Sequence, residues 1–334
     1  MAQVSVNSVN HALTAVVIQG LADREDFVGL RAAPPKGRQS LKGEYPVIQL
    51  AEGEMMRDNM ERREPGSAFK RVSAEIGLDS TKLQGDGLDI VIPTEVYEEF
   101  NASVEAGNED EGYDLLQVYG EEAFLNGLRL HERRVAALAQ GAGFDSVNST
   151  VAYTAGNLPD IRPSLDMQSA IRRIKARGEK ADAIFIPAEV WDRIKFADDL
   201  RTFITGNDKG TFTITPEMLA TAFAPQGIRK VEICEAYVNN AAKKKANIVP
   251  VWSNSHIFVG AADAEATGAD SLSNSRRMRS AMKTFFWEKL FGAPFVVKTF
   301  YDEDVESHIV RVWGFTDEKI VNARAGTRIA TQFA

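Results

Sequence analysis

Two short stretches carry residue types that perform catalysis in other proteins, and Ser67 and Lys70 form the first. They lie in "SAFK", with the S-x-x-K spacing in which a lysine activates a serine nucleophile. That chemistry also needs S-D-N and K-T-G stretches to place a base and an oxyanion partner. Neither stretch is present, since "VKTF" has Phe300 where the glycine would stand. A hydrolase that uses Ser67 and Lys70 is therefore only an alternative.

His131 and Glu132, in "LHERRV", form the second stretch. A zinc-protease helix has a second histidine four residues after the first, and Val135 occupies that position. The other histidines are scattered, and the single cysteine, Cys234, is typical of a small buried strand residue. No phosphate-binding glycine loop follows a strand. We therefore expect a packed or helix-exposed His131, no catalytic, cofactor or metal site, and a protein that is not an enzyme.

Charge is unevenly spread along the chain. Residues 93–122 contain ten acidic and no basic residues, which exceeds the net charge of −8 for all 334 residues. A protein that reads nucleic-acid sequence would show a dominant basic face, and this chain shows none. The acidic run is typical of a solvated helix face. No apolar stretch is long enough for a membrane span, so we expect no membrane contact.

The first part of the chain predicts an arm and a projecting hairpin. Residues 1–42 have too little apolar character to pack alone, and we expect them to lie on another surface. In residues 43–92, "GEYPVIQLA" and "FKRVSAEIG" are expected to pair as the legs of a hairpin, and "LDIVIP" is a further strand. The charged stretch between the legs, Ala51–Arg71, is far longer than an ordinary hairpin loop. We call it the extended loop.

The remaining chain alternates between helical and strand patterns. Residues 93–159 predict a helix from 94 and a second helix about 40 Å long, which ends near Gly141. Residues 160–290 predict a separate α/β unit, and residues 291–334 predict antiparallel strands. The long helix carries an apolar stripe along one face, formed by Leu116, Phe124, Leu128, Val135 and Leu138.

Both the arm and the extended loop need a partner surface, and the simplest partner is another copy of the chain. The extended loop balances five basic against five acidic residues, so its arginines can pair with carboxylates of a neighbour. The residues expected at contacts between copies are Arg57, Asp58, Glu61, Arg62, Arg63, Glu64, Lys70 and Arg71.

In the order of these elements and in their sequence patterns, the chain resembles the major capsid proteins of tailed bacteriophages, which share the Hong Kong 97 fold. The stretches that carry the resemblance are "FVGLRAAPPKGRQSLKGEYPVI", "REPGSAFKRV", "EEAFLNGLRLHERRVAALA", "SAIRRIKARGEKADAIFIPAEVWDRIK" and "FVVKTFYDEDVESHIVRVWGFTDEKIVNARAG". The resemblance implies an α+β fold with an N-terminal arm (1–42), an extended loop with flanking strands (43–92), a peripheral domain with a spine helix (93–159 and 291–334) and an axial domain (160–290).

The resemblance also implies a function. Copies would assemble into hexamers and pentamers and close an icosahedral shell around double-stranded DNA, bound without sequence specificity. We expect assembly in the cytoplasm of the bacterial host, a place in the virion, and a portal and a decoration protein as further partners. Because the chain begins almost directly in the arm, we expect a separate scaffolding protein. The basic residues of the axial domain, Arg276, Arg277, Arg279 and Lys283, are expected to pair with the acidic segment 93–122 of a neighbouring subunit.

One further feature separates this chain from some members of that family, and one alternative shares its fold. The part of the extended loop between Glu52 and Glu64 has no lysine, so we expect no covalent cross-link to a neighbour. The alternative is an encapsulin-like nanocompartment shell, which encloses enzymes instead of DNA.

Overall fold

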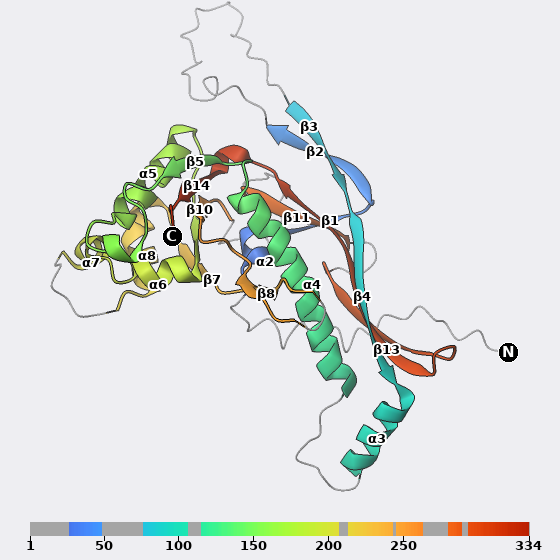
Figure 1. Cartoon of the computed structure of the whole chain (residues 1–334). Coiled ribbons are helices and arrows are strands. Elements are labelled where there is room, and N and C mark those ends of the chain that lie inside the picture. Colours follow the sequence, from blue (N-terminus) through green and yellow to red (C-terminus); the bar gives the residue numbers. More distant parts are fainter. Residues whose placement is uncertain are drawn as a thin grey trace, which may run out of the picture.

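The computed structural model describes residues 27–48, 76–105, 115–206, 213–242, 245–262, 280–288 and 293–333. These residues form two five-stranded sheets and two short two-stranded ladders (Figure 1). One long helix contacts strands of both sheets. The mixed α+β class predicted from the sequence is confirmed.

The first sheet is organised around one long strand, β13 (Ser307–Ile320). This strand pairs antiparallel with three others, and a further strand adds to the edge in parallel. Burial alternates along β13, so Val310 and Val312 face the core while Arg311 lies at the surface. The other strands are β1 (Pro35–Arg38), β4 (Gln84–Pro93), β11 (Met282–Trp287) and β12 (Val296–Asp302).

The spine helix is α4 (Leu115–Gln140), whose 26 residues span about 39 Å. Its first half packs Phe124 and Leu128 against strands β12 and β13. Its second half packs Val135 in a different cluster, together with Phe185 and Phe258 of the second sheet. The predicted apolar stripe therefore fills two cores in succession. A shorter helix, α3 (Thr94–Glu105), follows β4 and lies at the lower end of the molecule in Figure 1.

The second sheet has the strand order β5-β14-β10-β6-β7. Strand β6 is buried on both faces, because Ile184 and Ile186 point into one cluster while Phe185 points into the cluster shared with α4. The strands are β5 (Asp145–Asn148), β6 (Ala183–Pro187), β7 (Lys230–Cys234), β10 (His256–Gly260) and β14 (Gly326–Ala330). The helices that contribute to its core are α5 (Pro163–Ala176), α6 (Ala188–Ile194), α7 (Asp198–Thr205) and α8 (Pro216–Phe223). Cys234 is buried on β7, as predicted.

A two-stranded ribbon projects beyond the first sheet at the top of Figure 1. Its strands are β2 (Lys42–Ile48) and β3 (Ile76–Lys82), which pair antiparallel from Lys42 opposite Lys82 to Ile48 opposite Ile76. The predicted hairpin is therefore present. Its second leg lies later in the chain than predicted, and the extended loop lies outside the described residues. The second ladder pairs β8 (Tyr237–Asn239) with β9 (Ile248–Pro250).

The strand pairings correct the predicted division at residue 290. Strand β11, which we placed in the axial unit, belongs to the first sheet, whereas β5 and β14 belong to the second. Alternation along a strand predicts that it has a buried face but not which distant strand it pairs with. After β13 the chain leaves the first sheet, and β14 pairs with β10 of the second sheet, with Ile329 opposite Ile257.

The arm prediction is also corrected for residues 27–38. These residues were expected to lack a core, but Val28, Ala32 and Ala33 are 0% exposed, and β1 pairs with β11. The short helix α2 (Gly29–Ala32) lies beside α4. Small side chains permit this close packing, and small size gives only a weak apolar signal in the sequence. The preceding part of the predicted arm, residues 1–26, lies outside the described residues.

Candidate functional site: a fixed ribbon and an anchored arm segment

The base of the β2–β3 ribbon is fixed to the first sheet by Tyr45. Its side chain is 0% exposed, and its ring lies 5.2 Å from the ring of Phe285 on β11. The Tyr45 hydroxyl donates a hydrogen bond of 2.7 Å to Asp79 Oδ2 on β3. This bond lowers the pKa of Asp79, while burial raises the pKa of Tyr45. The ribbon therefore leaves the sheet in a defined direction.

Further polar contacts hold the same base. Arg38 Nη1 donates to the carbonyl of Glu44 at 3.2 Å, and its guanidinium lies 4.8 Å from the centre of the Phe285 ring. The N–H of Lys82 donates to Asp317 Oδ2 at 2.9 Å. Farther out on the ribbon, Leu78 is 65% exposed. A single exposed apolar residue does not by itself mark a contact surface.

Glu132 anchors the start of the arm segment, which we define as residues 27–38. The carboxylate is 1% exposed and accepts three hydrogen bonds. The N–H groups of Val28 and Gly29 donate at 3.3 and 2.5 Å, and Trp252 Nε1 donates at 2.5 Å. Burial raises the pKa of Glu132, and these bonds and the charge of Arg31 oppose that rise. One side chain thus connects the arm segment, the spine helix and the chain after β9.

His131 connects the end of α2 to the first sheet. It is 1% exposed, and its Nε2 lies 2.8 Å from Thr284 Oγ1 on β11. The Thr284 hydroxyl in turn donates to the carbonyl of Ala33 at 2.9 Å. Burial, with a smaller effect of the Arg134 charge, lowers the pKa of His131 to about 3. Of the two placements expected for His131, packed or helix-exposed, the structure shows the packed one.

The next turn of the spine helix is tied to β4 by an ion pair. Arg134 donates two hydrogen bonds to Asp86, of 2.7 and 2.9 Å. Across strands β4 and β13, Arg311 and Asp89 form a second bidentate pair with both bonds at 2.6 Å. These pairs fix β4, which continues directly from the ribbon, against the helix and the sheet.

Most of the predicted contact residues lie outside the described part of the chain. This holds for every residue of the extended loop named above, for Ser67, and for Arg276, Arg277 and Arg279. Lys283 is described, and its placement corrects the prediction. It lies on β11 of the first sheet and is only 2% exposed, so its side chain is not part of a surface cluster.

The sequence reasoning missed Glu132 as an anchor. The available signal was its position four residues after Leu128 and three before Val135, which places a carboxylate on the buried side of an amphipathic helix. A carboxylate at such a position requires partners, because an unpaired buried charge is costly. The identity of those partners depends on the tertiary fold, because two of them are backbone N–H groups.

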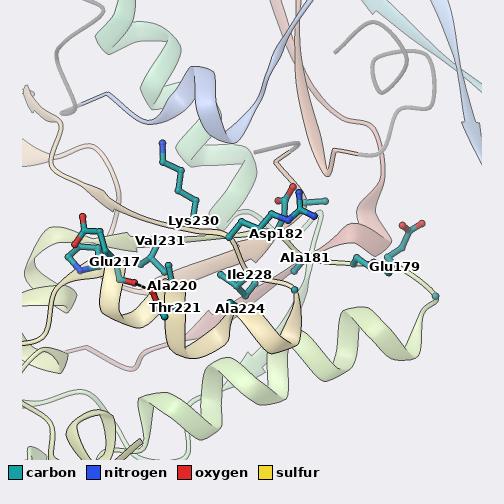
Figure 2. A pocket seen from close by; sticks show the side chains of 16 residues that line it. Glu179, Ala181, Asp182, Glu217, Ala220, Thr221, Ala224, Ile228, Lys230 and Val231 are labelled. Atoms are coloured by element: carbon teal, nitrogen blue, oxygen red, sulfur yellow. Dashed lines mark hydrogen bonds between the residues drawn. The ribbon is translucent and has the colours of Figure 1, made fainter. Parts of the chain in front are cut away.

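A cavity of about 1100 Å³ opens between α8 and the ends of strands β6 and β7 (Figure 2). Asp182, Glu217 and Lys230 line it, but Thr221, its hydroxyl-bearing residue, donates to the backbone carbonyl of Glu217 at 2.8 Å. The cavity therefore does not show a nucleophile held by a base. Among the described residues no three His, Cys, Asp or Glu side chains gather as metal ligands. None of the described helices has both the length and the apolar character of a membrane span.

Comparisons with solved structures identify the fold. The chain resembles a phage-related protein from Bordetella bronchiseptica over 97% of both chains, with a TM-score of 0.66 and 17% identity. It resembles the capsid protein of cyanophage P-SCSP1u over 91% of this chain and 86% of the other (TM-score 0.53, 10% identity). It also resembles the SrpI encapsulin of Synechococcus elongatus over 90% of this chain and 86% of the encapsulin chain (TM-score 0.50, 9% identity).

No protein-family model matches the chain, and a search of curated proteins gives no match. The structural likeness therefore rests on the arrangement of the backbone. It extends over 97% of this chain for the phage-related protein and 91% for the cyanophage capsid protein. The chain has the Hong Kong 97-type capsid fold.

Proposed function

We propose that the chain is a shell-forming subunit, the major capsid protein of a tailed bacteriophage. Copies assemble into hexamers and pentamers that close an icosahedral shell around double-stranded DNA. The observation that carries the proposal is the two-sheet architecture with its projecting ribbon, which matches a cyanophage capsid protein over most of both chains. The first sheet with α4 then corresponds to the peripheral domain, and the second sheet to the axial domain.

The ribbon and the extended loop carry the main contact between copies in this proposal. The ribbon has a rigid base at Tyr45 and exposed apolar area at Leu78. The extended loop lies in the chain between β2 and β3, and we assign its arginines and carboxylates to contacts with a neighbouring copy. Each contact can be weak, because a subunit in a shell makes many of them at once.

The charge of the chain supports packaging of DNA without tight binding. Phosphate contacts need cationic surface, and this chain has a net charge of −8. A shell with such subunits would hold DNA through enclosure and leave it free to exit. The proposal includes a scaffolding protein, a portal and a decoration protein as partners, assembly in the bacterial cytoplasm, and a final place in the virion.

The experiment uses charge variants of the extended loop. Arg62→Glu with Arg63→Glu reverses two charges that we assign to contacts between copies, whereas Arg62→Lys with Arg63→Lys keeps the charge and serves as the matched control. Electron microscopy and light scattering then measure shell formation. We expect the reversed variant to remain as small species and the lysine variant to assemble. Normal assembly of the reversed variant would remove the loop from the contact.

The basic residues Arg276 and Arg277 receive a separate test. We propose that they pair with the acidic segment 93–122 of a neighbouring subunit. Reversal of both charges should then weaken assembly at low salt more than at high salt, because salt screens the pair in the native chain. Equal assembly of the variant and the native chain at both salt concentrations would count against the pairing.

An encapsulin-like compartment is the second candidate, and the similarity to the SrpI encapsulin favours it. The two candidates differ in what the shell contains. Nuclease-protected double-stranded DNA in shells from infected or induced cells supports the capsid. A co-purifying enzyme in shells without nucleic acid supports the compartment.

A further inference from the structure

The arm segment, residues 27–38, is held at its start and just after α2 by two neighbouring side chains of the spine helix. Glu132 accepts the N–H groups of Val28 and Gly29 at its start. His131 reaches the carbonyl of Ala33 through the hydroxyl of Thr284. His131 and Glu132 are ionisable residues that we do not assign to contacts between copies. They lie between the arm segment and both sheets.

The hydrogen bonds fix the protonation of His131. A threonine hydroxyl has one hydrogen, and that of Thr284 is donated to the carbonyl of Ala33. The His131 nitrogen Nε2 therefore carries a hydrogen and donates it to Thr284. The other nitrogen, Nδ1, faces Gly29, where an added Cβ would lie 3.0 Å from it. No described residue accepts a hydrogen bond from Nδ1, so a second proton on the ring would have no partner.

The charged groups around His131 do not favour a cation. On α4, Arg134 repels a charged imidazole, while Glu132 is occupied by its three donors. On β13, Glu318 Oε1 lies 3.8 Å from Nε2, and burial raises the pKa of Glu318. On the arm segment, Arg31 adds positive charge, and it pairs with Glu232 on β7 at 3.3 Å.

The remaining neighbours supply no compensating negative charge. On β11, Lys283 precedes Thr284, so its side chain lies on the opposite face of the strand and brings no negative charge to His131. From the stretch before β12, the apolar ring of Phe295 faces the imidazole edge to face at 6.4 Å. Uptake of a proton by His131 in the closed arrangement is therefore unfavourable.

We propose that His131 is an acid sensor for the arm segment: when the imidazole takes up a proton, residues 27–38 detach from the spine helix while the second sheet stays folded. The segment is the part that can move, because it is short and joined to the first sheet by a single neighbouring strand. The inference concerns one chain and holds whether or not copies assemble.

The direction with pH follows from linkage. The pKa of His131 is about 3 when the segment is attached and returns toward 6.5 when it detaches. Detachment therefore becomes easier as pH falls below about 6.5, by about 30-fold in its equilibrium constant near pH 5. Glu132 acts in the opposite direction. Burial raises its pKa in the attached state, so protonation of its carboxylate as pH falls stabilises the attached state relative to the detached state.

The test measures backbone hydrogen exchange by mass spectrometry near pH 7.5 and near pH 5, corrected for intrinsic rates. Peptides from the arm segment are compared with peptides from α5, which serve as an internal reference. The matched variant is His131→Gln, whose side-chain N–H can still donate to Thr284 but does not titrate. Glu132 is present in both proteins, so the difference between them isolates His131.

We expect protection of the arm segment to fall by up to about 30-fold in the native chain near pH 5, while α5 keeps its protection and the glutamine variant changes little. An equal loss in the glutamine variant, no loss in the native chain, or a parallel loss in α5 would overturn the proposal. Gly29→Ala is a positive control, since its Cβ would lie 2.6 Å from Glu132 Oε2 and should loosen the segment at neutral pH.

A second readout needs no variant, in case the glutamine protein does not fold. Deuterium exchange at the imidazole C2 carbon measures the pKa of each of the four histidines in the native chain. We expect that His131 does not titrate above about pH 5 while the arm segment stays protected. An ordinary titration of His131 near 6.5 without loss of that protection would overturn the proposal.

Discussion

Replacement of Glu132 by alanine tests the anchor of the arm segment most directly. The change removes the acceptor of three donors: the N–H groups of Val28 and Gly29, and Trp252 Nε1. A buried donor left without a partner costs about 1–3 kcal/mol. Partial relaxation and entry of water reduce the sum, so we expect a loss of about 4 kcal/mol in the free energy of unfolding.

The measurement is urea unfolding followed by tryptophan fluorescence, because Trp252 contacts the altered side chain. Glu122→Ala on the same helix is the matched control. Glu122 forms an exposed pair with Arg129 at 3.1 Å, and such pairs contribute less than about 1 kcal/mol. Glu132→Gln keeps one acceptor and should fall between the two. A loss below about 1 kcal/mol for Glu132→Ala, or a loss equal to that of the control, would refute the assignment of Glu132 as an anchor.

The remaining predictions concern stability and its dependence on pH. Thr284→Val removes the link between His131 and the carbonyl of Ala33, and it should cost about 1–3 kcal/mol in urea unfolding. Asp89→Asn weakens an exposed pair with Arg311 and should cost less than about 1 kcal/mol. Phe185→Ala empties a site in the cluster that the second sheet shares with α4 and should cost about 3–5 kcal/mol; a smaller loss would mean that the second sheet and α4 are not packed as one body. Because the folded pKa of His131 lies below the unfolded value, its contribution is complete above pH 6.5 and should fall by about 2 kcal/mol at pH 5, measured as the difference between native and His131→Gln unfolding curves.

Local patterns in the sequence were sufficient to predict individual helices and strands. The spine helix followed from the spacing of Phe124, Leu128 and Val135, and all three are buried. The antiparallel strands predicted in residues 291–334 include β13, and the helix predicted from residue 94 is α3. These predictions succeeded because each depends only on residues within one element.

Long-range pairing could not be predicted in the same way. Strand β11 has the pattern of any buried strand, and only the fold decides that it pairs with β1 and β13. Residues 27–38 appeared too small and polar to pack. Val28, Gly29, Ala32 and Ala33 are nevertheless buried, and Glu132 satisfies the N–H groups of the first two. The bond to Gly29 joins positions 103 residues apart. Lys283 was assigned from its basic neighbours in sequence, although its strand places it inside the first sheet.

The central claim, that copies of this chain form a shell, is tested most directly by negative-stain electron microscopy with light scattering on the purified protein. The measurement is made with and without a co-expressed scaffolding partner and over a range of concentrations. The account predicts rings of five or six subunits or closed shells of uniform diameter. A monodisperse species near the subunit mass of 36.7 kDa under every condition would contradict it.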